Sequence, residues 1–225
     1  MKLSIIIPVY NEKGTIFKIL AEIEALPVEK EIIIVDDGST DGTREILKEI
    51  QNSNPKNLKI IFKEKNEGKG SAIREGLKYV NGDVVVIQDA DLEYNPVDLL
   101  EMLKVMEETG NEVIYGSRFL NRQSIPLINF IANKFLTWLT NILFSVKMTD
   151  METCYKLCSK NLLLSLNLQT NGFEIEPEIT CKILKKGIKI KEMSISYNPR
   201  RKGKKINWKD GIKAIFYIFK YRITR

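Results

Sequence analysis

The stretch GDVVVIQDADLEY, residues 82–94, decides the fold. Its four β-branched residues, Val84 to Ile87, predict a fully buried strand. Side chains two apart on a strand point the same way, so Asp89 and Asp91 are expected to project together from its carboxyl end, where open α/β sheets bind ligands. Two neighbouring carboxylates stay ionised when a cation lies between them. The stretch therefore predicts a metal site; an Asp-rich turn that caps the next helix is the alternative.

Alternating strand and helix patterns surround this stretch. Buried strands are predicted at 3–8, 31–35, 58–62, 84–87 and 112–116, and amphipathic helices at 12–26, 43–51, 68–80 and 96–108. The connections are short. The pattern predicts an α/β fold with a doubly wound, mostly parallel sheet and helices on both faces.

After Arg118 the pattern changes. We expect helices at 125–146, 174–185 and 208–223, strands at 154–157 and 188–197, and a basic loop at 198–205. The length predicts a single domain, residues 1–225, with a ligand-binding half at 1–118 and a second half at 119–225.

The charge of the chain is uneven. The formal net charge is +6, and the basic residues of segment 198–225 face a single acidic residue, Asp210. Such a tail indicates an anionic partner: a phosphate, a lipid headgroup or a nucleic acid; a solvated basic face is the alternative. Nucleic-acid binding is disfavoured, because no base-reading motif or stacking platform is present.

The chain has three cysteines and no histidine, which excludes a tetrahedral zinc site and indicates reduced thiols. No uninterrupted apolar run reaches the length of about 18 residues that indicates a membrane span. The first residues resemble a strand rather than a secretory signal. We expect a cytoplasmic protein.

Polar clusters follow three of the predicted strands. They are PVYNE at 8–12, VDDGSTDGT at 35–43 and QDADLEY at 88–94. In a doubly wound sheet these strand ends share one edge. The ring of Tyr10 and the carboxylates of Glu12 and Asp37 suit a nucleoside, and the Asp89/Asp91 pair suits a diphosphate.

Together with NEGKGSAIREG at 66–76 and GSR at 116–118, these motifs resemble family 2 glycosyltransferases with the GT-A fold. The nearest branch is the polyprenyl-phosphate (dolichol-phosphate) mannosyl- and glucosyltransferases. The resemblance implies inverting transfer of a hexose from a UDP- or GDP-sugar. It makes residues 1–118 the nucleotide-sugar-binding half and residues 119–225 the acceptor half.

The resemblance also implies roles for individual residues. Asp89 and Asp91 hold Mg²⁺ or Mn²⁺, and Glu93 is a third candidate ligand, although the family often has glutamine there. The nucleotide sugar is expected at the following residues: Pro8, Tyr10, Glu12, Asp37, Gly70, Asp89 and Ala90.

The acceptor decides which further groups the reaction needs. A hydroxyl acceptor requires a general base, for which Asp150 is the candidate. A phosphate acceptor is already anionic and requires cations instead. The candidate cations are Arg118, Lys134, Arg200 and Arg201. The catalytic residues are thus expected to be Asp91, Arg118 and Asp150, with a lipid-linked phosphate as the favoured acceptor and a glycan or glycolipid hydroxyl as the alternative.

The last predicted helix, 208–223, is basic and amphipathic. It is suited to lie on an anionic bilayer, which would place the protein peripherally on the cytoplasmic face of the membrane. Packing of its apolar side against the core is the alternative.

Overall fold

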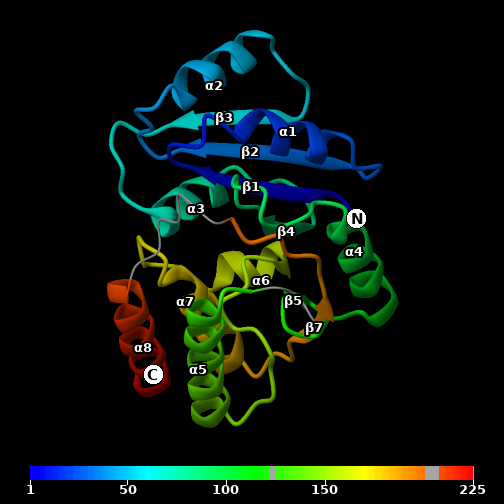
Figure 1. Ribbon diagram of the computed structural model, residues 1–225. Coiled ribbons are helices and arrows are strands. Elements are labelled where there is room, and N and C mark those ends of the chain that lie inside the picture. The colour runs from blue at the N-terminus through cyan, green and yellow to red at the C-terminus, as the bar shows by residue number, and fades with distance from the viewer. Residues whose placement is uncertain (122–124, 201–207, 225) are drawn as a thin grey trace.

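The computed structural model describes residues 1–121, 125–200 and 208–224. Within these residues a seven-stranded sheet has the order β3-β2-β1-β4-β6-β5-β7 (Figure 1). The strands are β1 Leu3–Val9, β2 Lys30–Asp36, β3 Leu58–Phe62, β4 Val84–Ile87, β5 Val113–Ser117, β6 Lys156–Ser159 and β7 Lys191–Ser194. The pairings of β6 with β4 and β5 are antiparallel, and the other pairings are parallel. The predicted α/β, mostly parallel sheet is confirmed.

The helices connect and cover these strands. They are α1 Ile16–Glu24, α2 Thr43–Asn52, α3 Lys69–Leu77, α4 Asp98–Thr109, α5 Leu127–Phe144, α6 Lys160–Ser165, α7 Ile175–Lys185 and α8 Trp208–Ile223. The first two helices accompany the β1–β3 part of the sheet, whereas α5, α7 and α8 gather at the other end (Figure 1). Between these ends, α3 packs on β1 and β2 and α4 packs on β5.

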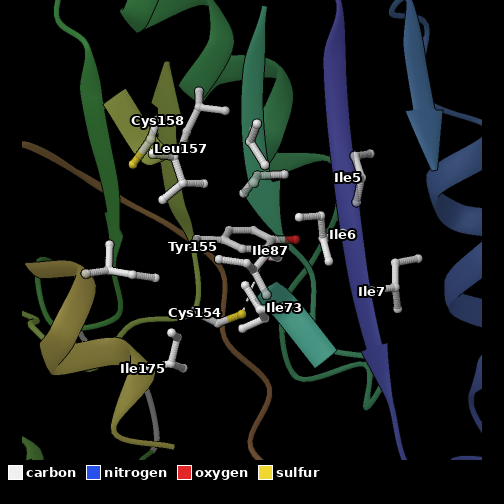
Figure 2. Close-up of a cluster of buried hydrophobic side chains, with 14 of the residues drawn as sticks. Ile5, Ile6, Ile7, Ile73, Ile87, Cys154, Tyr155, Leu157, Cys158 and Ile175 are labelled. Atoms are coloured by element: carbon white, nitrogen blue, oxygen red, sulfur yellow. Dashed lines mark hydrogen bonds between the residues drawn. The ribbon is translucent and has the colours of Figure 1, made fainter. Parts of the chain in front are cut away.

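The core runs without a break from β1 across β4 to β6. Ile6, Ile87 and Tyr155 are fully buried, and the Tyr155 ring extends toward Ile87 and Ile6 (Figure 2). Burying a large apolar side chain contributes about 1.5–3 kcal/mol. The Tyr155 hydroxyl also donates a hydrogen bond to Oε1 of Gln88. Because Gln88 directly precedes Asp89, this contact fixes the point where β4 ends and the acidic pair begins.

The first strand extends further than the sequence predicts. Strand β1 passes through Pro8 to Val9, although proline usually ends a central strand. The register explains the difference. Pairing with β4 covers only Leu3 to Ile6, and the Gln88 N–H donates to the Ile6 carbonyl at 2.9 Å. Pro8 is two residues after Ile6, so its backbone nitrogen also faces the β4 side of β1. Strand β4 has already ended there, so no hydrogen bond of the sheet is lost at Pro8.

Several other elements differ from the sequence prediction in their bounds, and three of these differences have a local explanation. Helix α4 begins at Asp98, not Pro96, after a turn in which Oδ1 of Asn95 accepts from the Val97 N–H at 3.1 Å. Strand β6 begins at Lys156 rather than Cys154, because the Cys154 N–H donates to the Tyr94 hydroxyl at 3.1 Å. Helix α6 was not predicted, since its six residues are too few to show a helical period.

Candidate active site

The carboxyl ends of β2, β1 and β4 lie next to one another, since these strands are parallel neighbours. Hydrogen bonds join the loops that follow the first two strands. The Asn11 N–H donates to Oγ of Ser39 at 2.9 Å, and Oδ1 of Asn11 accepts from the Thr40 N–H at 2.8 Å. Pro8 and Tyr10 are half-buried at this edge, and Ala90 is buried between the two aspartates. The structure therefore brings the three polar clusters together, and their nucleotide contacts stay predictions.

Asp37, at the end of β2, binds the turn that precedes α3. Its carboxylate is buried and accepts from the Gly68 N–H at 2.7 Å, the Glu67 N–H at 3.1 Å and Nζ of Lys63 at 2.6 Å. These contacts hold the turn before α3 against the end of β2. In this conformation Asp37 supports the predicted nucleotide site, and its direct contact with a base stays a prediction.

Gly70 has a packing reason to be glycine. A Cβ built on it would lie 2.5 Å from the carbonyl oxygen of Thr170. The start of α3 thus touches the loop before α7, and the Ser71 N–H donates to the Asn171 carbonyl at 3.0 Å. A nucleotide contact for Gly70 is compatible with this packing but is not required to explain the glycine.

The acidic pair sits between two cations. Oδ1 of Asp89 is 2.7 Å from Nζ of Lys69, and Oδ2 of Asp91 is 3.6 Å from Nη2 of Arg200. The side chains of Asp89 and Asp91 are 24% and 16% exposed, so both reach solvent. Burial, followed by the negative charges of Asp89 and Glu93, raises the pKa of Asp91 to about 7. Crowded carboxylate oxygens with excess negative potential fit a hard divalent cation.

Glu93 has other partners in this conformation. Its carboxylate accepts from the Tyr197 hydroxyl at 2.5 Å and from the Arg200 N–H at 2.9 Å. Within 1–121, 125–200 and 208–224, no group of three His, Cys, Asp or Glu side chains is arranged to hold a metal. In this conformation Glu93 is occupied by Tyr197 and Arg200, and its role as a third metal ligand stays a prediction.

Arg200 reaches the nucleotide edge from the far end of the chain. Its Nη1 lies 3.1 Å and 3.2 Å from the two carboxylate oxygens of Glu12. The same guanidinium approaches Asp91, so it connects the predicted nucleotide and metal sites. Arg201, also predicted to bind phosphate, lies outside the described residues.

Asp150 and Arg118 form a bidentate ion pair. Nε of Arg118 donates to Oδ2 of Asp150 and Nη2 donates to Oδ1, both at 2.7 Å, and the Arg118 N–H adds a third bond to Oδ2 at 3.0 Å. Asp150 is fully buried. Its base role stays a prediction that this geometry does not favour, because both of its oxygens already accept from Arg118.

Lys134 stands beside this pair on α5. Its Nζ donates to the Thr149 carbonyl at 3.2 Å and lies 4.2 Å from the centroid of the Phe119 ring. The residue is half-buried, so its ammonium is held close to Arg118 without being sealed from solvent. Two of the four predicted acceptor cations therefore lie together on one side of the site.

The sequence analysis missed a buried network of ion pairs next to Asp89. Nζ of Lys69 is 3.0 Å from Oε1 of Glu176, and Glu176 also pairs with Lys156. Burial is the largest single effect and lowers the pKa of Lys69, but the combined attraction of its acidic neighbours, led by Asp89, outweighs burial and holds the pKa well above its usual range. Lys69 was visible in the 66–76 motif. Glu176 gave no signal, because it is more than 80 residues away on α7, a helix predicted without a site role.

The sheet and its acidic edge define a class of protein: a GT-A glycosyltransferase. The chain belongs to glycosyl transferase family 2, whose model matches residues 4–163.

Relatives and solved structures agree with that assignment. Glycosyltransferase AglJ of Haloferax volcanii is 26% identical over 97% of this chain and 70% of its own length. Dolichol-phosphate mannosyltransferase of Pyrococcus furiosus is 29% identical over 90% of this chain and 58% of its own. Glucosyl-3-phosphoglycerate synthase from Mycobacterium tuberculosis, crystallised with Mn²⁺, uridine-diphosphate and glucosyl-3-phosphoglycerate, is similar with a TM-score of 0.76 at 20% identity, over 98% of this chain and 79% of that chain.

Proposed function

We propose that this glycosyltransferase moves a hexose, with inversion, from a UDP- or GDP-sugar to the phosphate of a polyprenyl-phosphate lipid, with Mg²⁺ or Mn²⁺ bound by Asp89 and Asp91. The observation that carries the proposal is the acidic pair at the end of β4, open to solvent and flanked by Lys69 and Arg200. A bound divalent ion would act there as a Lewis acid that stabilises the departing diphosphate.

The acceptor side supports a phosphate nucleophile. An oxygen of the acceptor phosphate would attack C1 of the sugar while the bond from C1 to the donor diphosphate breaks. An anionic phosphate needs no strong base. Asp150 is poorly placed to act as one, because both of its carboxylate oxygens accept hydrogen bonds from Arg118. Arg118 and Lys134 would position the phosphate as cations. The similarity to a dolichol-phosphate mannosyltransferase supports the lipid, and transfer to a hydroxyl is the alternative.

A two-stage assay tests this function. UDP- and GDP-hexoses are first screened for thermal stabilisation of the protein with Mn²⁺ or Mg²⁺; a donor at 100 times its Kd is expected to add about 2.7 kcal/mol. The stabilising donor is then offered a polyprenyl phosphate and the matching polyprenol. Transfer to the phosphate alone is expected. Transfer to the alcohol alone would favour a hydroxyl acceptor, and no transfer to the polyprenyl phosphate would contradict the proposed acceptor.

Replacing Lys134 with alanine is expected to raise the KM for the acceptor phosphate about tenfold or more, because a hydrogen bond from a charged donor contributes about 1.5–3 kcal/mol. The KM for the donor should not change. Lys48→Ala, at an exposed lysine on α2, is the control. Equal effects of the Lys134 variant on the two KM values would remove Lys134 from the acceptor site.

Metal affinity is expected to depend on pH through Asp91. The pKa of Asp91 is about 7, so a divalent ion must displace its proton below that pH. Mn²⁺ affinity should rise about tenfold per pH unit up to about pH 7 and then level off, as measured by calorimetry. In the unfolded chain Asp91 has its ordinary pKa of 3.8, so between about pH 4 and about pH 7 the folded state binds a proton that the unfolded state has lost. The metal-free protein therefore becomes less stable as the pH rises through this range. Asp91→Asn should abolish both dependences.

A further inference from the structure

Helix α5 exposes a continuous apolar stripe. Its members follow one another at intervals of three or four residues and are 47–82% exposed: Ile128, Ile131, Phe135, Trp138 and Ile142. The other side of the helix is buried through Leu136, Leu139 and Thr140. A surface helix normally turns its apolar stripe inward, so α5 carries a second apolar face that the described part of the domain leaves exposed.

Helix α8 repeats this arrangement. Its exposed apolar residues are also three or four apart: Trp208, Ile212, Phe216, Phe219 and Ile223. The helix packs on the domain through Ala214, Ile218 and Tyr221 instead. The helix thus packs on the core, as the alternative predicted, but through a face that leaves these five side chains exposed.

The two helices are neighbours. They lie side by side in Figure 1 and contact each other, and Nε of Arg222 on α8 donates to the Leu143 carbonyl on α5 at 2.7 Å. Adjoining helices that each expose apolar side chains offer the kind of surface that marks a protein or membrane contact.

Charge selects between these partners. Lys209, Lys213 and Lys220 are exposed on one side of the α8 stripe, and Arg222 is exposed on the other. Long basic side chains that flank an apolar, aromatic-rich stripe extend their charges to phosphate headgroups while the stripe enters the interface. A second copy of this chain would bring the same positive charges together. The charge pattern therefore fits an anionic bilayer better than self-association.

Helix α5 is attached to the domain and does not stand apart from it. It is long and apolar enough to cross a membrane, with a mean hydropathy of 1.2, but 22% of it is buried in the fold. Oγ1 of Thr137 accepts from the Met151 N–H at 3.1 Å, and Asn141 exchanges hydrogen bonds with the backbone of Met148. These bonds tie α5 to the loop that carries Asp150, which favours a helix that lies on the membrane.

We infer that the exposed stripes of α5 and α8 together form a docking face for an anionic lipid bilayer. The inference deepens the proposed function and rests on it for its purpose, because a polyprenyl-phosphate acceptor resides in a bilayer. Lys134 lies on α5, so docking of this helix would hold the acceptor side of the site near the headgroups.

Sedimentation of the full chain with vesicles tests the docking face. Vesicles of equal parts phosphatidylcholine and phosphatidylglycerol are expected to bind the protein in a salt-sensitive manner, and pure phosphatidylcholine vesicles much less. Lys213→Gln and Lys220→Gln should each lower the partition coefficient about fivefold. Lys48→Gln, on α2, should leave it unchanged. Absence of binding to the anionic vesicles would overturn the inference.

Apolar variants test the two helices separately. Trp138→Ser on α5 and Phe216→Ser on α8 should each weaken vesicle binding by about tenfold or more, whereas Phe17→Ser, at an equally exposed phenylalanine on α1, should not. Weakening of vesicle binding by only one of the two variants would overturn the inference that both helices form the docking face. So would light scattering that shows a dimer dissociated by Phe216→Ser, with unchanged vesicle binding.

The outcomes separate docking from catalysis. The vesicles contain no acceptor, so they measure docking alone. Vesicle binding combined with no transfer to polyprenyl phosphate in the separate acceptor assay would leave the docking face standing and contradict the proposed function. Transfer to a short, water-soluble prenyl phosphate without vesicle binding would do the reverse.

Discussion

Replacing Asp91 with asparagine is expected to lower the rate of sugar transfer by about a thousandfold or more. A divalent ion contributes several kcal/mol of charge stabilisation to the leaving diphosphate, and each 1.36 kcal/mol corresponds to a factor of ten. The substitution keeps the shape of the side chain but removes one of the two carboxylates at the end of β4. The measurement is turnover at saturating donor and Mn²⁺, together with the metal-dependent part of the thermal stabilisation by donor.

Asp83→Asn is the matched control, since Asp83 is an exposed aspartate at the opposite end of the same strand. It should retain activity and the metal-dependent stabilisation. If Asp91→Asn kept the full Mn²⁺-dependent shift in stability, the metal assignment at β4 would be wrong.

Replacing Asp150 with alanine is expected to lower the free energy of unfolding by about 3–5 kcal/mol, because removal of one partner leaves a buried, uncompensated charge on Arg118. Asp150 is fully buried, and only 9% of the Arg118 side chain is exposed. Urea denaturation of the metal-free protein measures the change. Glu24→Ala, at an exposed carboxylate in the last turn of α1, should change stability by no more than about 0.5 kcal/mol.

A double variant shows whether the loss comes from the uncompensated charge. Arg118→Met combined with Asp150→Leu is expected to recover much of the stability, because an apolar pair replaces a buried ion pair at little or no cost. It should not recover catalysis if Arg118 positions the acceptor. A double variant less stable than Asp150→Ala would show that the pair stabilises the fold beyond its charge balance.

The pair also changes how a test of Asp150 as a base must be interpreted. Loss of turnover in an Asp150 variant does not by itself indicate a hydroxyl acceptor, because the variant also releases Arg118. The comparison of phosphate and alcohol acceptors avoids this ambiguity.

Local patterns were sufficient to predict the order of strands and helices in residues 1–118 from the sequence. Val84 to Ile87 are β-branched and buried, and the helices between the strands have a regular period. Strands that alternate with helices through short connections run parallel, so the mostly parallel sheet could be predicted. The position of Asp89 and Asp91 on the ligand-binding edge follows from the same rule.

The ion-pair partners of the site residues could not be predicted from the sequence. Glu176 meets Lys69 across 107 residues, and Arg200 meets Glu12 across 188. Periodicity describes neighbours on one element and carries no information about such distant contacts. For the same reason, the alternation of apolar residues in α8 defined its stripe but not whether that stripe faces the core or solvent.

Arg200 has a consequence for the order of events at the site. Its guanidinium approaches Asp91, which a donor-bound ion would also contact, so the two compete for one carboxylate. Competition of this kind is reciprocal: by whatever factor the contact of Arg200 with Asp91 weakens ion binding, a bound ion weakens that contact by the same factor. Arrival of a metal-loaded donor should thus release the guanidinium from Asp91 while Glu12 keeps Arg200 at the site.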